Sequence, residues 1–391
     1  MMPGSLPSPA GHLLTTHTGS LPRPSRLAQL LIARDRGDER AGLEDAVQEA
    51  VMDVVRRQAE VGLDLVSDGE MGKVGYAWYV RDRLTGFDGE ADWPGRRRPE
   101  MDAHPDFAER WEAQLDRGSL TAPACNGEVR VKDAEAVHRD IALLKAAAAR
   151  AGVALDRLFM TAASPGVISH FFTNQYYRSR EAYLVALAEA MRPEYEAIAA
   201  AGIVLQIDCP DLAMSRHSVF ADRTLDDFRR EAELSVEALN HAVAKIPADR
   251  MRMHVCWGNY EGPHDYDVPL RDVVDVILRA KPAGIAIEAA NPRHGHEWRV
   301  WEEVRLPEGR YLIPGVIDST NNYVEHPELV AQRLLNYCRV VGPDRVVGGS
   351  DCGFGTFAGR HTVVPTVTWA KLRSLVQGAE LAARELARAG I

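Results

Sequence analysis

Residues 201–259 read AGIVLQIDCPDLAMSRHSVFADRTLDDFRREAELSVEALNHAVAKIPADRMRMHVCWGN. Two short apolar runs in this stretch, Val204–Asp208 and Arg252–Cys256, enclose a helical pattern over Thr224–Ala244, where apolar residues recur every three and four positions. A strand, a helix and a second strand in this order predict a βα unit with parallel strands. The stretch therefore predicts an α/β protein.

The same alternation continues along the whole chain. Eight short β-branched or apolar runs can be counted, and polar or Gly/Pro-rich residues follow each of them. Because eight is the number of strands in a (β/α)8 barrel, we predict one TIM barrel over residues 1–391. The predicted strands are Leu13–His17, Leu63–Ser67, Phe159–Ala163, Val204–Asp208, Arg252–Cys256, Ile285–Glu288, Leu312–Ile317 and Val346–Ser350. The predicted helices are Gly42–Ala59, Ala134–Arg150, Ser179–Ala200, Thr224–Ala244, Leu270–Leu278, Pro327–Val340 and Thr368–Ala389.

One segment departs from this alternation. Residues 86–128, between the second and third predicted strands, are rich in Gly, Pro, Arg and acidic residues and show neither the helical nor the strand period. We predict that this segment is an insertion within the barrel. A segment of this length is more often a solvated surface loop than a second catalytic domain, so we expect a surface loop. The insertion could cover the barrel mouth or form the subunit contact of a homo-oligomer.

Composition and charge exclude several classes of protein. Hydrophobic residues make up 46% and charged residues 26%, which excludes disordered and collagen-like chains. The formal net charge of −10 repels phosphate backbones and anionic lipids, so neither nucleic acid nor a membrane is an expected partner. Since no apolar run approaches the roughly 20 residues of a membrane span and no signal-peptide pattern opens the chain, we predict a cytoplasmic protein. Five cysteines, an odd and sparse set, predict reduced thiols and leave metal binding open.

The strand ends carry the candidate chemistry, because active sites of such barrels lie at the carboxyl ends of the strands. His254 and Cys256 stand two residues apart, on one face of a strand, where both can ligate one ion. Glu288 and Cys352 end two further strands and complete a His/Cys/Glu/Cys set, and thiolates select zinc over hard cations. The predicted cofactor is Zn²⁺, although a His-x-Cys pair on its own is more often a buried core feature. Other polar residues at strand ends are Gly19, Ser20, Glu70, Asp208 and Asp318.

Six segments then stand in a specific order: TTHTGSLPRP (15–24), VSDGE (66–70), LQIDCPDLA (205–213), MHVCWGN (253–259), AIEAA (286–290) and SDCGFGT (350–356). In order and strand placement they resemble the catalytic barrel of cobalamin-independent methionine synthase and its shorter single-barrel relatives. The resemblance extends over nearly the whole length of the chain. It implies a zinc-bound homocysteine thiolate that attacks an electrophilic carbon, because zinc deprotonates a thiol and leaves its sulfur nucleophilic.

The resemblance also implies a role for each matching position. The zinc ligands would be His254, Cys256, Glu288 and Cys352; Gly19 and Ser20 would seat the carboxylate of homocysteine; Glu70 and Asp208 would hold its ammonium group; Asp208 and Asp318 would be catalytic.

Two segments differ from the family pattern. Full-length synthases carry a proton-donating histidine shortly after the seventh-strand aspartate, whereas here Thr320 stands near that place and the next histidine is His326. The tryptophan that stacks on folate is absent from FMTAASPGVISHFF (159–172). The alkyl donor is therefore left open.

Several functions follow from this pattern. We predict zinc-dependent transfer of a methyl or other alkyl group from a small-molecule donor to a small-molecule thiol. Epoxyalkane:coenzyme M transferases are the alternative, and their anionic acceptor would need a cation such as Lys73, Arg23 or Arg293. A metal-independent lyase of the uroporphyrinogen decarboxylase type, and a zinc-thiolate barrel that senses thiols without turnover, remain open as well.

Overall fold

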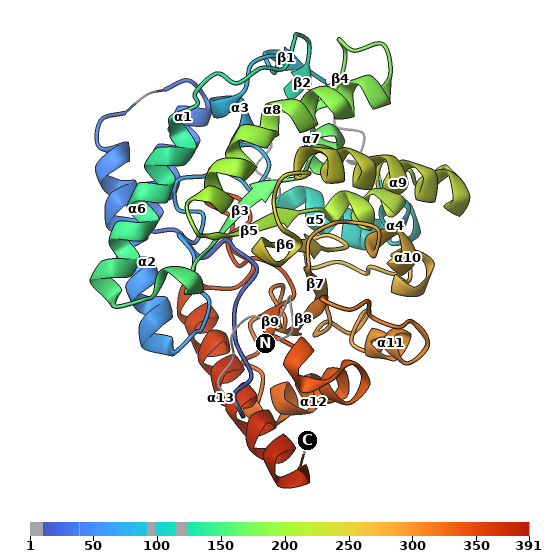
Figure 1. Ribbon diagram of the computed structural model, residues 1–391. Helices are drawn as coiled ribbons and strands as arrows, with labels where there is room; N and C mark the ends of the chain where they lie inside the picture. Colours follow the sequence, from blue (N-terminus) through green and yellow to red (C-terminus); the bar gives the residue numbers. More distant parts are fainter. Residues whose placement is uncertain (1–10, 39, 92–97, 115–122, 391) are drawn as a thin grey trace.

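A curled parallel sheet lies at the centre of the computed structural model, which describes residues 11–38, 40–91, 98–114 and 123–390 (Figure 1). Six strands follow one another in the order β3-β5-β6-β7-β8-β9, each parallel to its neighbours. The α/β class and the last six predicted strands are confirmed, although the final strand is shorter than predicted. The strands are β3 Phe159–Ala163, β5 Val204–Asp208, β6 Met251–Val255, β7 Gly284–Glu288, β8 Tyr311–Ile317 and β9 Gly349–Ser350.

The register of the sheet brings the strand ends level. Ala163 pairs with Asp208, and Asp208 pairs with His254. On the next pair of strands Glu288 is opposite Gly315. Every residue of β3, β5, β6, β7 and β8 is buried, as expected for parallel strands covered on both faces. The polar side chains at the carboxyl ends are thus held by a dry, regular framework.

The first two predicted strands, Leu13–His17 and Leu63–Ser67, form no regular strand in the described chain. Thr15 makes one parallel bridge to the residue before β9, and Val66 makes one to the residue before β3. These two segments lie between the ends of the six-stranded sheet and also bond to each other, because Leu65 N donates to the carbonyl of Thr15. We predicted a regular strand at each of these two places, and the structure has a single bridge to the sheet at each instead.

Side chains explain why the pairing stops at single bridges. The backbone N–H of Thr15 donates to Oδ2 of Asp64 at 2.8 Å, and the N–H of Ser67 donates to Oε1 of Gln58 at 3.0 Å. A carboxylate or amide that takes a backbone donor removes it from the strand ladder. Period and composition do not reveal this competition, because its partners come from elsewhere in the chain.

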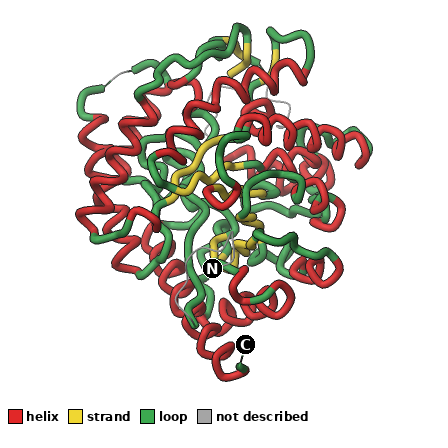
Figure 2. Tube along the Cα trace, in the orientation of Figure 1, coloured by secondary structure: helices red, strands yellow, loops and turns green. Residues whose placement is uncertain are grey.

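Helices surround the central strands (Figure 2). The predicted helices 42–59, 134–150, 179–200, 224–244, 327–340 and 368–389 are confirmed to within three residues at each end. The helices of the ring are α1 Ser25–Asp35, α2 Leu43–Val61, α3 Val80–Arg83, α6 Ala136–Ala151, α7 Pro165–Phe171, α8 Arg180–Ala200, α9 Leu225–Ala242, α10 Val274–Ile277, α11 Val300–Glu303, α12 Pro327–Val341 and α13 Pro365–Ala389.

Two helix starts show how well local sequence sets the ends. Thr224 caps α9, since its side chain accepts from Asp227 N while the Asp227 side chain accepts from the Thr224 backbone, a reciprocal capping box. By contrast, the predicted helix Leu270–Leu278 is divided into a 3₁₀ turn, Leu270–Asp272, and α10. Val273 between them has φ −131°, outside the helical region.

The described part of segment 86–128 contains short regular elements where the sequence showed no period. These are β1 Gly89–Glu90, α4 Pro99–Ala103, α5 Pro105–Gln114 and β2 Pro123–Cys125, and β2 pairs with β1 and with β4 Thr173–Asn174. Glu100 of α4 is fully buried and bonds to the hydroxyl of Tyr260 and the backbone N–H of His264. The segment therefore packs on the loop that follows β6, at the carboxyl end of the sheet.

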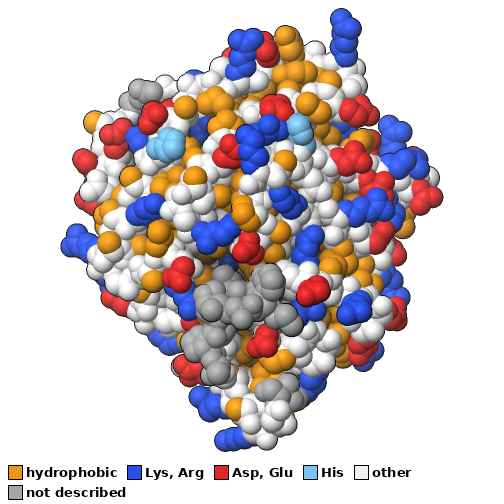
Figure 3. Space-filling model, viewed as in Figure 1, with side chains coloured by type: hydrophobic (Ala, Val, Ile, Leu, Met, Phe, Trp, Pro, Cys, Tyr) orange, Lys and Arg blue, Asp and Glu red, His pale blue; other side chains and the backbone are white. Residues whose placement is uncertain are grey.

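The surface carries charge of both signs. On the face in Figure 3, acidic and basic side chains are interspersed. Among the described residues, no helix combines the length and the apolar character that a bilayer span requires.

Candidate active site

Three of the predicted metal ligands lie together at the carboxyl ends of the strands. His254 belongs to β6, Cys256 follows β6 directly, and Cys352 lies just after β9. One ligand atom from each lies within 4.8 Å of the other two, and Sγ of Cys352 is 3.7 Å from Nε2 of His254. All three side chains are buried. We call these three residues the sulfur group.

The protonation of the sulfur group is coupled through short contacts. A hydrogen bond from Cys352 lowers the pKa of Cys256, whereas burial raises the pKa of Cys352 itself. Burial alone would lower the pKa of His254, but the charge of Cys256 and the contact with Asp208 raise it to about 9. One imidazole and two thiol groups form a donor set that suits a borderline-soft divalent metal.

Glu288, the fourth predicted ligand, lies beside the sulfur group but is not one of its three mutually close members. Its Oε1 is 3.6 Å from Sγ of Cys352 and accepts from the backbone N–H of Trp257 at 2.8 Å. Its Oε2 accepts from Nδ2 of Asn291 at 2.7 Å. Because both oxygens already have donors, Glu288 would have to share or exchange one of them to reach a metal.

A line of polar contacts orients His254 from within the sheet. Nδ1 of His254 is 3.4 Å from Oδ1 of Asp208, which accepts from Nε2 of Gln206 at 2.9 Å. Gln206 in turn accepts from Nε of Arg252 at 2.8 Å. A carboxylate behind the histidine fixes the ring so that Nε2 points toward the cysteines. Asp208 therefore contacts the sulfur group through the imidazole ring of His254.

The backbone of Glu70 is strained and clamped. Its φ is +58°, in the left-handed region that residues with a side chain rarely adopt. The guanidinium of Arg23 donates twice to the carbonyl of Glu70, from Nε at 3.2 Å and from Nη2 at 2.8 Å. Its third nitrogen donates to the carbonyl of Gly355 in the loop after β9. A strained residue held this firmly is typical of functional sites.

The carboxylate of Glu70 has one satisfied oxygen and one free oxygen. Lys73 Nζ donates to Oγ1 of Thr161 at 2.9 Å, so that this hydroxyl gives its own proton to Oε1 of Glu70 at 2.8 Å. Oε2 is buried and has no hydrogen-bond partner within the described chain. Burial raises the pKa of Glu70, Lys73 opposes this shift, and the nearby carboxylate of Asp208 adds to it.

Gly19 and Ser20 line the same region. Gly19 has φ +139°, and a Cβ atom there would lie 2.9 Å from Oε1 of Glu70 and 2.7 Å from Cγ2 of Thr161. Only glycine permits this approach. The carbonyl and hydroxyl of Ser20 accept from backbone N–H groups of the loop after β9, so that Ser20 joins the first segment to the loop that carries Cys352.

Asp318 lies at the end of β8, buried, with its carboxylate turned to its own loop. Oδ1 accepts from the backbone and hydroxyl of Thr320 at 2.7 Å each, and Oδ2 accepts from Asn321 at 2.5 Å. His326 is exposed and caps α12 by accepting from the N–H of Glu328, a structural position at a helix start. The loop thus brings no histidine to the sulfur group.

A second group of histidines, which the sequence does not predict as a cluster, surrounds Asp267. Asp267 is surrounded by His217 at 3.0 Å from Oδ1, and by His264 at 2.9 Å and His294 at 3.0 Å from Oδ2. The other ring nitrogen of His294 contacts Glu297 at 2.9 Å. Burial would raise the pKa of Asp267, but the hydrogen bonds of His264 and His294 and the charge of His217 hold it well below its ordinary value. No motif spacing marks this cluster, because its members come from three separate loops.

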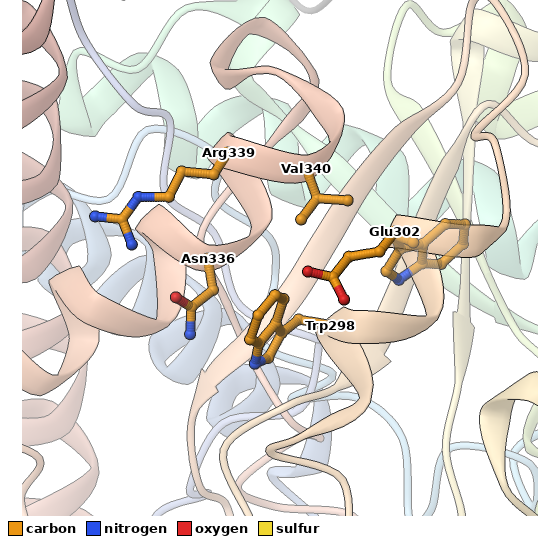
Figure 4. A pocket seen from close by; sticks show the side chains of 6 residues that line it. Trp298, Glu302, Asn336, Arg339 and Val340 are labelled. Atoms are coloured by element: carbon orange, nitrogen blue, oxygen red, sulfur yellow. The ribbon is translucent and has the colours of Figure 1, made fainter.

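A surface pocket of about 440 Å³ lies elsewhere, between α11 and α12 on the outer ring (Figure 4). Its lining contains none of the predicted site residues, so it adds nothing to the sulfur group. The lining residues are Trp298, Trp301, Glu302, Asn336, Arg339 and Val340.

Comparisons with known proteins agree with this architecture. The family described as cobalamin-independent synthase, catalytic domain, matches residues 166–380. A methionine synthase of Thermococcus kodakarensis is 28% identical over 381 residues, which cover 97% of this chain and 96% of that protein. One of Sulfolobus acidocaldarius is 24% identical, covering 97% and 94%.

A solved structure shares the fold. The B12-independent methionine synthase of Shewanella sp. W3-18-1, in complex with selenomethionine, superposes with a TM-score of 0.71 at 21% identity, covering 96% of this chain and 99% of that one. Because the family model matches residues 166–380, the relatives match in length and the solved structure shares the fold, this chain belongs to the cobalamin-independent synthase catalytic-domain family.

Proposed function

We propose that this protein transfers a methyl or other alkyl group to the sulfur of an ammonium-bearing thiol such as homocysteine, with zinc as its cofactor. One observation carries the proposal: the sulfur group contacts the buried carboxylate of Asp208, whose charge acts on the buried carboxylate of Glu70, and Glu70 has an oxygen without a partner in the described chain. A thiol with an ammonium group would satisfy both features at once.

Zinc fits the residues that are present. His254, Cys256 and Cys352 offer nitrogen and two sulfurs, and Glu288 is near enough to be a fourth ligand that yields to an incoming sulfur. Zinc bound there would lower the pKa of an acceptor thiol and keep its sulfur nucleophilic. Asp208 would hold the ring of His254 in place from behind.

The acceptor is argued from the charges around Glu70. Its buried Oε2 needs a donor, and an ammonium group provides a charged one. An anionic thiol such as coenzyme M would instead need a free cation. Arg23 and Lys73 are both engaged with acceptors inside the protein, and Arg293 is exposed. An acidic substrate of the decarboxylase type would also need free cations, and Arg23 and Lys73 are not free to bind it.

The names of the relatives point the same way, because the curated proteins of similar length are methionine synthases. We propose Gly19 and Ser20 as the seat of the acceptor carboxylate. Asp318 would act on the substrate only if its loop releases it, since Thr320 and Asn321 occupy its oxygens.

We further infer that residues 1–391 form one (β/α)8 barrel with residues 86–128 as an insertion. The backbone bonds of Thr15 and Val66, which link β9 to β3 through the first two segments, support a closed ring.

Calorimetry on the zinc-loaded protein tests the acceptor. We expect homocysteine to bind, and 4-mercaptobutyrate, which lacks only the ammonium group, to bind about a hundredfold more weakly, since a buried charged hydrogen bond is lost. Equal binding of the two thiols, or tighter binding of coenzyme M, would refute the assignment of Glu70 to an ammonium group.

A further inference from the structure

The ammonium group of Lys73 is buried without an ion-pair partner among the described residues. Lys73 lies in the loop after Glu70 and is 5% exposed. Its Nζ donates to the carbonyl of Thr161 at 2.7 Å and to Oγ1 of Thr161 at 2.9 Å, and both acceptors are neutral. Burying an ammonium group is costly unless other groups compensate its charge. The placement of Lys73 therefore points to a role beyond packing.

An aromatic ring holds the same ammonium group from another side. Nζ of Lys73 lies 4.3 Å from the ring centroid of Tyr79, and a ring face stabilises a desolvated cation. The hydroxyl of Tyr79 is fixed in turn, because it donates to Oε1 of Glu194 at 2.7 Å and accepts from the backbone N–H of Ala163 at 3.2 Å. Thr161 and the ring of Tyr79 thus hold Lys73 in one place.

The hydrogen bonds from Lys73 to Glu70 run in one direction only. An ammonium group can only donate, so the hydroxyl of Thr161 accepts from Lys73 and gives its single proton to Oε1 of Glu70, 2.8 Å away. Because Oε1 is an acceptor, a proton taken up by Glu70 would lie on Oε2, the oxygen without a partner in the described chain. Oε2 can therefore accept from an ammonium group only while Glu70 is ionised.

Three charged side chains act on the carboxylate of Glu70, in addition to burial, which raises its pKa. The charge of Lys73 lowers this pKa and the charge of Asp208 raises it. Arg23 also lowers this pKa, although its guanidinium is bonded to the carbonyl of Glu70 and not to the carboxylate. On α6, Lys73 also lowers the pKa of Asp140, which burial raises. Of the two cations, Lys73 is the one that hydrogen bonds link to the carboxylate of Glu70.

We propose that Lys73 is a positioning residue that acts through the hydroxyl of Thr161, so that Glu70 stays ionised and its Oε2 accepts from the ammonium group of the acceptor. The inference rests on the proposed function and names the residue on which recognition of that ammonium group depends. In this role Lys73 binds no part of the acceptor. Its charge serves Glu70 and not an anionic substrate.

Calorimetry with two thiols on the zinc-loaded protein tests this role. Homocysteine has the ammonium group and 4-mercaptobutyrate lacks it, so the ratio of their affinities reports on the ammonium group alone. Both thiols keep an ionised carboxylate between about pH 5.5 and about pH 8, and the ratio is measured across this range. Any loss of zinc in acid affects both thiols and leaves the ratio unchanged.

Lys73→Met keeps the length of the side chain and removes its charge and its donors. Loss of a nearby opposite charge raises the pKa of a carboxylate by about one unit or more, so Glu70 takes up a proton at a higher pH. We expect the ratio to be about tenfold lower than in the parent near about pH 6, and the difference to disappear toward about pH 8. Zinc content and the affinity for 4-mercaptobutyrate should be those of the parent.

Two further variants complete the test. Lys73→Gln keeps a donor for Thr161 without the charge and should lower the ratio in the same way, so the test does not depend on one variant that folds. Lys281→Met is the matched control. Lys281 lies just before β7, at the opposite end of the sheet, and its ammonium group donates to the carbonyls of Val243 and Ala244. This variant should match the parent at every pH.

The outcomes separate this inference from the proposed function. If the parent binds the two thiols equally, the proposed function fails and the role of Lys73 fails with it. If the parent prefers homocysteine and the variants of Lys73 keep the same ratio at every pH, only the role of Lys73 is overturned. An equal loss of affinity for both thiols also overturns it, because that result indicates a structural role.

Discussion

Two buried groups at the carboxyl end of the sheet look alike in composition and differ in what their atoms have left to bind. The sulfur group has one histidine and two thiols whose ligand atoms lie close to one another, and the nearest carboxylate oxygen to Cys352, Oε1 of Glu288, is 3.6 Å from its Sγ. The Asp267 cluster has three histidines, yet its carboxylates lie within 3.0 Å of ring nitrogens. A metal needs ligand atoms with free lone pairs, so we propose the first group as a metal site and the second as a structural ion cluster.

Residue type alone therefore does not identify a metal site. His294 has carboxylates at both ring nitrogens, Asp267 on one side and Glu297 on the other, and must carry two protons to satisfy both. His254 contacts a carboxylate through one nitrogen only and directs the other toward sulfur. Accounting for each nitrogen, and not the number of histidines, separates the two groups.

The largest expected effect is at the sulfur group. Cys352→Ser removes a thiolate ligand, and we expect loss of zinc and a fall in alkyl transfer of about a thousandfold or more, since a metal supplies several kcal/mol to such steps. Metal analysis and product formation check this. Cys338→Ser, at a buried thiol of α12 outside the group, is the control and should keep both. Zinc retained in full by Cys352→Ser would erase the distinction between the two groups.

A smaller effect is expected where the site has its free oxygen. Glu70→Gln keeps the shape but removes the charge that would meet the ammonium group. We expect the KM for homocysteine to rise about a hundredfold, by the loss of a charged hydrogen bond, while zinc remains bound. Steady-state kinetics with metal analysis measures both quantities. An unchanged KM would remove Glu70 from the acceptor site.

The hydroxyl that aims Glu70 should matter less. Thr161→Val leaves Oε1 of Glu70 and Nζ of Lys73 without their shared partner. We expect a rise in KM of about tenfold, the cost of one buried hydrogen bond, with recovery in Thr161→Ser. If Thr161→Ser is as weak as Thr161→Val, packing of the methyl group and not the hydroxyl positions Glu70.

The smallest effect on catalysis is expected in the Asp267 cluster, where the effect is on stability. Burial alone would lower the pKa of His294, but Asp267 and Glu297 raise it from 6.5 to about 10. A raised pKa stabilises the folded state fully below pH 6.5 and loses this contribution as pH rises through 10. His294→Gln should therefore keep zinc and lose about 3 kcal/mol of unfolding free energy at pH 6, with the deficit narrowing toward pH 10. Urea unfolding at several pH values measures this, and zinc loss from His294→Gln would contradict the comparison.

The pattern of apolar residues along the chain predicted those strands that depend on burial alone. The runs Phe159–Ala163 and Val204–Asp208 are strands with the predicted bounds, because apolar residues there are covered on both faces. Residues 13–17 and 63–67 have the same apolar character but lose backbone donors to Asp64 and Gln58. Such competition depends on tertiary contacts that no period reveals.

The site divides in the same way. The alternation of side chains along a strand and the positions of the strand ends were enough to predict that His254, Cys256 and Cys352 lie close together. The donors on Glu288, the positive φ of Glu70 and the cluster around Asp267 depend on side chains from separate loops. These features needed coordinates, because nothing in the spacing of their residues marks them.

Zinc-edge X-ray absorption on the protein, alone and with homocysteine, tests the central claim most directly. We expect zinc to have sulfur neighbours from Cys256 and Cys352 at rest, and one more sulfur neighbour when homocysteine is added. Coenzyme M should add none. A metal-free protein, or a zinc ion whose sulfur neighbours do not increase with homocysteine, would contradict thiol activation at the sulfur group.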